Sequence, residues 1–331
     1  MLKSRLCIAF FAFAVGCAPA QKPLTDYVNP MLGTATLWDS VDLGFKPTKR
    51  TWGAEVFPGS SLPNAMVQVS PVTKFHSGAG YQYEDSVIYG FTHTNKGHWN
   101  LCHIPLLPVT GTPTPGDYCS PFSHERESAA PGYYQVFLDR YGVDAQLSST
   151  LRCAFHKYTY PAGAAPVLAD LQRSNEHVRA WDIRKEGDNV FAGWQQTGEK
   201  MYFYAVANRP VTGIEPVVEG DREVRIVRFG EGDGALELRI GFSFVSEKNA
   251  RENLEAEMLG KSFAEVRSEA TATWNDLLGR IRVEGGTERE KGLFYSSLYR
   301  SFLWPALRSD VNGEFTDVDG TVINPGFRYY T

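Results

Sequence analysis

The sequence has 331 residues, of which 43% are hydrophobic, 13% aromatic and 21% charged, and its formal net charge is −5. Such a composition is typical of a globular protein, and the length allows two domains. No block of lysine and arginine residues offsets the net negative charge. The sequence therefore gives no support for a nucleic-acid partner or for binding to an anionic membrane surface.

The first twenty residues have the organisation of an export signal. Lys3 and Arg5 precede a short apolar stretch, residues 8–15, and the Ala-Pro-Ala sequence at 18–20 offers a cleavage site. The apolar stretch is too short to span a bilayer. The four residues ending at Cys17 also resemble a lipobox, which would place a lipid on that cysteine. Two destinations stay open: a soluble periplasmic protein, or one attached to the outer membrane only through Cys17.

Three cysteines follow the export signal, at Cys102, Cys119 and Cys153. An odd number in an exported protein allows at most one disulfide and leaves a spare thiol. No Cys-x-x-Cys spacing occurs. We expect these residues to serve mainly as small buried apolar side chains.

Short extended segments follow one another after about residue 60. The predicted strands are residues 134–138, 146–160, 167–171, 190–194, 201–207, 223–229 and 236–245. Glycine, aspartate and asparagine residues separate some of them, at 186–189 and 230–234. This succession predicts a mainly β protein with a large antiparallel β-sandwich.

The sequence pattern becomes helical after the last of these strands. Between Leu254 and Leu278, apolar residues recur every three or four positions, with Gly260 dividing two helices and Gly279 ending the second. Thr287 and Glu290 then form a capping box that predicts a further helix reaching towards residue 307. A single amphipathic helix cannot bury its own apolar face, so this helix needs packing partners.

The last part of the chain predicts a hairpin. Asn312-Gly313 and Asp319-Gly320 are turn dipeptides on either side of the segment between Glu314 and Ile323. Residues 328–331 bring neither a helix end nor a polar tail, which suggests a longer protein. The predicted domains are an export signal (1–20), a β-sandwich (22–246), a helical linker (247–286) and the start of a helical domain (287–331).

Polar and aromatic residues are densest between residues 77 and 108. Glu84 and Asp85 are adjacent at a predicted strand end, where they point to opposite faces and do not form an acid–base pair. His93, His98 and His103 are five residues apart, a spacing that fits neither one helix face nor a common zinc site. We therefore assign them no metal.

A loop around Trp99 is the best candidate for sugar recognition. Trp99 lies between His98 and Asn100 in a polar, glycine-containing stretch. An aromatic plane can pack on the CH face of a pyranose while neighbouring polar side chains bond its hydroxyls. The alternative is that Trp99 only anchors the loop or the core. Trp52 lies in a second segment of this type, residues 51–59.

Asp117 and the run Ser123-His124-Glu125 contain the residue types of a hydrolytic triad. No Gly-x-Ser-x-Gly elbow accompanies them, so we regard the combination as a coincidence. A phosphate-binding glycine loop is also missing from the sequence.

Several segments, in order, resemble glycoside hydrolase family 92, the calcium-dependent exo-acting α-mannosidases. The resemblance covers nearly the whole chain after the export signal. The matching segments are residues 27–34, 57–59, 66–71, 80–85, 88–94, 118–125, 131–134, 152–161 and 294–310.

The resemblance implies a β-sandwich, a helical linker and an (α/α)6 barrel, of which this chain holds only the first helix. In the family, the sandwich supplies a loop to an active site between the domains, and a bound Ca²⁺ contacts mannose hydroxyls. A glutamic acid donates a proton and an aspartate activates water with inversion. We expect these residues and the calcium ligands beyond Thr331, and we assign no catalytic residue in this chain.

The loop after Thr94 departs from the family pattern, since residues 95–100 read Asn-Lys-Gly-His-Trp-Asn. A tryptophan at this place favours an α-1,2-linked mannose pair. In the later hairpin, Asp317 and Asp319 are either sugar-hydroxyl ligands or ordinary turn aspartates.

The predicted function is therefore that of the N-terminal part of an inverting exo-α-mannosidase acting on N-glycans or mannans, inactive as a fragment. The alternative is a non-catalytic carbohydrate-binding or structural module.

Overall fold

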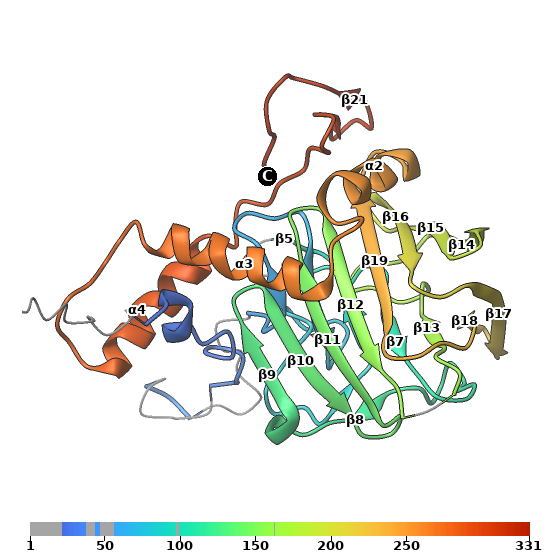
Figure 1. Ribbon diagram of the computed structural model, residues 1–331, viewed down its shortest axis with the longest axis horizontal. Coiled ribbons are helices and arrows are strands. Elements are labelled where there is room, and N and C mark those ends of the chain that lie inside the picture. Colours follow the sequence, from blue (N-terminus) through green and yellow to red (C-terminus); the bar gives the residue numbers. More distant parts are fainter. Residues whose placement is uncertain (1–21, 38–43, 47–55, 97–98, 162) are drawn as a thin grey trace, which may run out of the picture.

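Two antiparallel sheets stacked face to face make up most of the protein (Figure 1). The computed structural model describes residues 22–37, 44–46, 56–96, 99–161 and 163–331, with only the backbone at 95, 96 and 99. The export signal, Cys17, Trp52, His98 and the Trp99 side chain lie outside the described part.

The first sheet has seven strands. Their order across the sheet is β1 (Ser60–Ser61), β2 (Gln68–Val72), β4 (Gly90–Thr92), β7 (Leu106–Pro108), β13 (Val167–Ala169), β18 (Arg222–Phe229) and β17 (Val211–Glu219).

The second sheet has eight strands. Their order is β14 (Ala180–Gly187), β15 (Val190–Gln196), β16 (Lys200–Ala207), β19 (Leu236–Ser243), β12 (Cys153–Thr159), β11 (Val143–Ser149), β10 (Tyr133–Leu138) and β9 (Glu127–Ala130). Smaller pairs join β3 (Val87–Ile88) to β8 (Ser120–Pro121), and β5 (Asn95–Lys96) to β6 (Trp99–Asn100). The predicted antiparallel β-sandwich is confirmed.

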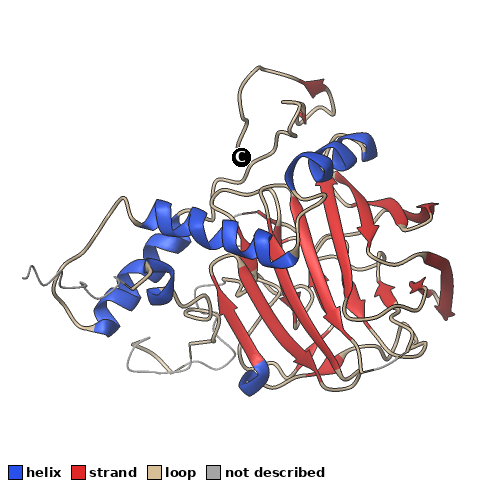
Figure 2. Ribbon diagram, viewed as in Figure 1, coloured by secondary structure: helices blue, strands red, loops and turns tan. Residues whose placement is uncertain are grey.

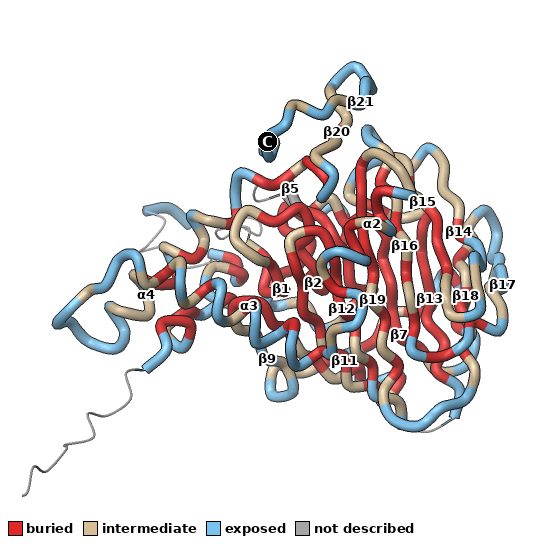
Figure 3. Tube along the Cα trace, turned by 45° about the horizontal axis from the view of Figure 1, so that its top comes forward, coloured by how far each residue is buried: buried red, intermediate tan, exposed pale blue. Residues whose placement is uncertain are grey.

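The main hydrophobic core lies between the two sheets (Figure 3). Along β16, side chains alternate strictly between buried and half-buried, and the buried ones include Met201, Phe203 and Ala205. Phe91 and Leu107 of the seven-stranded sheet belong to the same core. This period of two is what a strand with one face on the core requires.

One strand prediction was wrong in its extent. The segment 146–160 forms parts of two paired strands, β11 and β12, with Ser149 opposite Ala154 in the register. The chain turns at residues 150–152, where the Thr150 N–H donates to the Cys153 carbonyl. No glycine or proline marks this turn in the sequence.

Two edge strands, β14 and β17, were not predicted. Half of β14 is charged, and β17 contains Pro216, which removes a ladder donor. Proline is tolerated at the edge of a sheet because the missing N–H faces away from the neighbouring strand. Both strands lie at the ends of their sheets, where side chains are less buried and alternate less clearly.

Two helices cover the outer face of the eight-stranded sheet (Figure 2). α2 (Glu247–Glu257) packs on β19 and β16, and α3 (Phe263–Leu278) packs on β11 and β12. Ser262 and Glu265 form a capping box at the start of α3, and Gly279 caps its end. The predicted pair of helices divided near Gly260 is confirmed.

A third helix, α4 (Glu288–Ser301), packs beside the sandwich against α3 and the short η1 (Leu24–Tyr27). Its predicted capping box is confirmed, with Thr287 and Glu290 bonded reciprocally. The buried Trp274 indole of α3 donates to the Ser61 carbonyl at 2.8 Å and so ties this helical unit to the sandwich.

The predicted hairpin follows α4, with β20 (Phe315–Thr316) paired to β21 (Val322–Ile323). Cys102, Cys119 and Cys153 are all free thiols; Cys102 and Cys153 are buried as expected, whereas Cys119 is half-buried. Within the described residues, no helix is both long enough and apolar enough to cross a membrane.

Candidate functional site

Several loops and the C-terminal segment gather at one end of the sandwich (Figure 1). The Asn175 N–H donates to the Leu101 carbonyl, which joins the segment after β13 to the loop after β6. Arg308, after α4, pairs with Glu199 in the β15–β16 turn at 2.5 Å. This end is the candidate site because it contains the β5–β6 hairpin that carries Trp99.

Asn100 anchors that hairpin from inside. Its side chain is buried, its Oδ1 accepts the Cys102 N–H at 2.8 Å, and its backbone N–H donates to the Gly78 carbonyl. Gly80 has φ +73°, and a Cβ there would lie 2.7 Å from Asn100 Nδ2. The structure thus places Asn100 under the loop, while the side chains of its predicted neighbours His98 and Trp99 lie outside the described part.

The loop that follows has an unusual backbone. Cys102 and Ile104 have φ of 53° and 52°, in the left-handed region that non-glycine residues rarely adopt. His76, whose N–H donates to Asn175 Oδ1, has φ 59°. Of the four non-glycine residues with positive φ in the described chain, two therefore lie in this loop and a third is bonded to Asn175. Such strain concentrates at functional sites, where the surrounding structure holds it.

His103 forms the centre of a buried hydrogen-bond relay. Its Nδ1 lies 2.7 Å from Thr94 Oγ1 and its Nε2 lies 3.0 Å from Thr197 Oγ1. The Thr197 hydroxyl donates to Glu176 at 2.5 Å, so it accepts from His103 Nε2, and Thr94 donates to Nδ1. Burial lowers the pKa of His103 to about 4, which keeps the ring neutral.

Two further buried histidines, His93 and His156, lie beneath the β5–β6 hairpin. His93 Nε2 and His156 Nε2 are 2.9 Å apart, and His156 Nδ1 lies 2.6 Å from the Tyr158 hydroxyl. The two Nε2 atoms share one proton, so the rings are opposite tautomers. Burial lowers the pKa of His93 to about 3 and that of His156 well below its usual range.

Nowhere among the described residues do three or more His, Cys, Asp or Glu side chains converge so that they could hold a metal ion. His93 and His103 are each engaged with other partners.

The C-terminal segment forms a loop whose two ends, residues 306–307 and 330–331, are hydrogen-bonded to each other. Leu307 forms a bridge with Tyr330, and Ala306 and Thr331 exchange two backbone hydrogen bonds of 2.9 and 3.0 Å. The loop between them carries the β20–β21 hairpin with Asp319 at its turn. Asp319 is exposed and accepts the Thr321 N–H at 2.8 Å, a bond that lowers its pKa.

Comparison with known proteins accounts for this architecture. Residues 27–253 match the family model described as Glycosyl hydrolase family 92 N-terminal domain, and residues 249–331 match that of the Glycosyl hydrolase family 92 catalytic domain. The chain belongs to glycosyl hydrolase family 92.

Solved structures of family 92 proteins have the same fold. The family GH92 alpha-mannosidase BT3965 from Bacteroides thetaiotaomicron is similar with a TM-score of 0.83 and 26% identity, over 94% of this chain and 45% of that chain. The family GH92 inverting mannosidase BT2199 from the same organism has a TM-score of 0.77 and 26% identity, over 93% and 44%.

A curated relative, an uncharacterized secreted glycosidase of Arthroderma benhamiae, is 25% identical over 344 residues, which are 87% of this chain and 42% of that protein. The chain therefore spans less than half the length of each of these three proteins.

The two family 92 domains meet in α2, since their matches overlap at residues 249–253. Asn249 and Asn253, one turn apart, both donate to the buried carboxylate of Asp310, at 2.9 and 2.7 Å. Ser243 of β19 donates to it at 2.6 Å. Burial raises the pKa of Asp310, and these three hydrogen bonds oppose that effect.

Arg152 completes this junction. Its Nε donates to the Ser309 carbonyl at 2.8 Å, and its Nη1 lies 2.6 Å from Glu257 Oε1 in α2. One buried guanidinium thus joins the β11–β12 turn, α2 and the segment that follows α4. The sequence contains no signal for these contacts, because the partners are more than a hundred residues apart.

The triad-like residues of the family 92 sandwich have other roles. Asp117 pairs with Arg140, and His124 lies between the Glu127 carboxylate (2.6 Å) and the Tyr83 carbonyl (2.7 Å). No nucleophile–base pair forms among them, in agreement with our interpretation. Sequence reasoning missed Glu127, whose buried carboxylate also accepts hydrogen bonds from Tyr81 and Tyr134.

Glu84 and Asp85 lie in a turn, so the predicted strand end was wrong. The Asp85 N–H donates to the Gln82 carbonyl, which closes this turn. Glu84 accepts from both the N–H and the hydroxyl of Thr36, whereas Asp85 accepts from the Thr73 hydroxyl. The two carboxylates hold different segments of the loop.

Proposed function

We propose that the protein to which this chain belongs hydrolyses terminal α-mannosides with inversion. The observation that carries the proposal is the likeness, over 94% of the chain, to an alpha-mannosidase that has also been solved in complex with mannoimidazole. The likeness to an inverting mannosidase supports the stereochemical part. In an inverting glycosidase, one carboxyl protonates the leaving oxygen while a second activates water across the sugar.

This chain supplies one wall of the substrate site and not the groups that react. We use the term substrate wall for the residues that form it, which are Trp52, His98, Trp99, Asn100 and Asp319. Trp99, the first residue of β6, contacts the sugar beyond the cleaved bond together with His98 and Trp52. Asn100 positions the hairpin through its buried hydrogen bonds. Asp319 accepts a sugar hydroxyl from the exposed turn of the C-terminal hairpin.

The metal and the linkage complete the proposal. Ca²⁺ would be bound by residues of the catalytic domain outside this chain, and hydroxyl oxygens of mannose would coordinate it there. Trp99 selects the α-1,2 linkage of N-glycans or mannans. Export through residues 1–20 is supported by the relative's description as secreted. The periplasm, or a lipid anchor at Cys17, is the destination that we propose.

The test is an assay of the full-length protein on α-1,2-, α-1,3- and α-1,6-mannobiose, with and without a calcium chelator. We expect hydrolysis that prefers the α-1,2 linkage, releases the β-anomer first and stops when calcium is removed. Turnover that ignores chelation would refute the calcium part, and failure on all three would refute the function.

Trp99→Ala tests the substrate wall. We expect the KM for α-1,2-mannobiose to rise about tenfold, the equivalent of one lost aromatic contact. Trp194→Ala is the matched control, because this half-buried tryptophan of β15 stacks only with Lys200 among described residues. Equal effects of the two substitutions would remove Trp99 from the site.

A second function applies to the chain as given, since it spans less than half of its relatives. Residues 21–331 alone act as a non-catalytic sandwich module, either structural or weakly glycan-binding. We expect no mannoside turnover from this fragment, and any turnover would contradict that expectation.

A further inference from the structure

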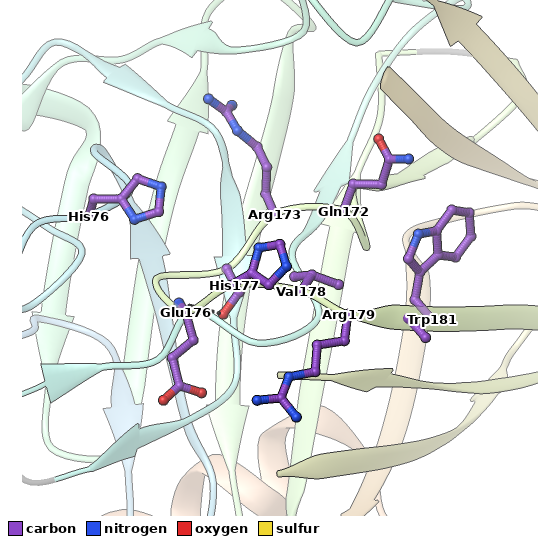
Figure 4. Close-up of a pocket in the computed structure, with 10 residues that line it drawn as sticks. His76, Gln172, Arg173, Glu176, His177, Val178, Arg179 and Trp181 are labelled. Carbon is purple, nitrogen blue, oxygen red and sulfur yellow. Dashed lines mark hydrogen bonds between the residues drawn. The ribbon is translucent and has the colours of Figure 1, made fainter. Parts of the chain in front are cut away.

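A groove of about 600 Å³ opens beside the β5–β6 hairpin, on the segment between β13 and β14 (Figure 4). Figure 4 shows His76 and Trp181 on opposite sides of it, with His177 and Arg179 between them. Gln172, Arg173, Ser174 and Glu176 also line it. None of these residues belongs to the substrate wall described above.

The segment under the groove is hydrogen-bonded to the base of the β5–β6 hairpin. Asn175 Nδ2 donates to the Asn100 carbonyl at 2.5 Å and to the Ser77 carbonyl at 2.9 Å. The Ser174 hydroxyl donates to the Leu101 carbonyl at 2.6 Å. Any ligand in the groove therefore lies against a segment that is rigidly joined to the base of the hairpin.

The rim residue His76 is held in a strained conformation. Its φ of 59° costs on the order of 1 kcal/mol for a non-glycine residue. Asn175 Oδ1 compensates by accepting the His76 N–H at 2.6 Å. The strain keeps an exposed imidazole at the edge of the groove rather than folded back on the loop.

Two of the charged side chains at the groove are engaged by other residues. The Arg173 guanidinium donates to the Tyr118 hydroxyl at 3.2 Å and packs on the rings of Phe75 and Tyr89. The Glu176 carboxylate accepts the Thr197 hydroxyl at 2.5 Å. Arg179, whose side chain is exposed, is therefore the charged donor that a ligand in the groove meets.

The groove also offers both surfaces that a sugar needs. Trp181 is half-exposed and provides an apolar plane, with Arg225 5.3 Å from its ring. The exposed His177 and Arg179 side chains make no hydrogen bond or ion pair with another residue of the described chain. Donors beside an aromatic plane match the hydroxyls and CH face of a pyranose.

We propose that this groove is a second carbohydrate subsite, which binds a further neutral hexose unit of the glycan whose terminal mannose is removed. The proposal rests on the proposed function, and it assigns to the sandwich a preference for longer or branched oligosaccharides over disaccharides. The shared Asn175 framework keeps the two sugar positions at a fixed separation.

The test compares a mannotetraose with α-1,2-mannobiose on the full-length protein carrying His177→Ala and Arg179→Ala together. We expect the ratio of kcat/KM for the longer to the shorter substrate to fall about tenfold, mainly through KM, as two lost hydrogen bonds imply. Lys185→Ala is the control, since Lys185 is an exposed cation of β14, the strand that follows these two residues, and lies outside the groove.

Calorimetric titration of mannotetraose into the same proteins separates the two proposals. If the wild type cleaves no mannoside but binds mannotetraose through the groove residues, the function fails and the subsite stands. An unchanged ratio and unchanged binding in the double variant would overturn the subsite. Binding that disappears in 0.5 M salt would also overturn it, because a neutral sugar is insensitive to ionic screening.

Discussion

The guanidinium of Arg152 and the carboxylate of Glu257 form an ion pair of 2.6 Å in which the side chains are only 5% and 14% exposed. Because a buried charge without its partner is costly, Arg152→Ala should lower the free energy of unfolding by about 3–5 kcal/mol. Urea denaturation followed by circular dichroism measures this change.

The same helix provides the control for this prediction. Arg251 and Glu255 form an exposed pair of 2.7 Å on α2, with side chains 57% and 44% exposed. Arg251→Ala should change stability by less than about 0.5 kcal/mol, as is usual for surface pairs one turn apart. Similar losses in the two variants would mean that burial does not decide the strength of the Arg152 pair.

Asp310→Ala should loosen the C-terminal loop selectively. The substitution leaves the donors of Ser243, Asn249 and Asn253 without their shared acceptor, at a cost of about 1–3 kcal/mol. We expect faster hydrogen exchange over residues 311–323 with little change in β19. Asp319→Ala, in the exposed turn, should leave exchange at the base of the hairpin unchanged; equal effects would contradict the anchoring role of Asp310.

The buried histidines predict sensitivity to acid. The pKa of His103 falls from 6.5 to about 4 on folding and that of His93 to about 3, so the unfolded chain binds more protons between these values. Stability is therefore complete above pH 6.5 and is lost as the pH falls towards 4. Each histidine contributes on the order of 1–2 kcal/mol of loss at pH 5.

Denaturation midpoints at pH 7 and pH 5 measure this loss. His103→Gln should be less stable at pH 7 but should show a smaller further loss at pH 5, because one titrating group is gone. His177→Gln, at an exposed position, should keep the wild-type pH dependence. A wild type equally stable at both pH values would contradict the prediction.

Gly241→Ala should displace α2 from the sheet. A Cβ at Gly241 would lie 2.1 Å from the Ala250 carbonyl oxygen and 2.8 Å from Leu254 Cβ, so helix and strand must separate. We expect a loss of about 1–3 kcal/mol in unfolding free energy. Gly213→Ala on edge strand β17 meets only Glu215 Oε1, at 3.9 Å, and should be tolerated; comparable losses would refute the close-approach argument.

The sequence was sufficient for the elements whose signals are local. Thr287 with Glu290 and the Asn-Gly and Asp-Gly turns predicted α4 and the β20–β21 hairpin. The turn at residues 150–152 could not be predicted, because its polar groups are satisfied by Glu257, about a hundred residues later. Nothing within a window of ten residues distinguishes that turn from a continuous strand.

The candidate site was predicted only in part for the same reason. The polar and aromatic composition pointed to the β5–β6 hairpin, but the burial of Asn100 depends on Gly80 and Gly78 from another loop. Ser174 and Asn175 look like ordinary loop residues in the sequence. Their importance comes from the carbonyls of Asn100 and Leu101, which folding brings to them.

The bridge between Leu307 and Tyr330 closes the base of the C-terminal loop. The backbone hydrogen bonds of Ala306 and Thr331 hold the two ends of the loop together without any contribution from the β20–β21 hairpin. We therefore expect the protein to tolerate hairpins of different length or sequence between these two residues, provided that Asp310 is kept.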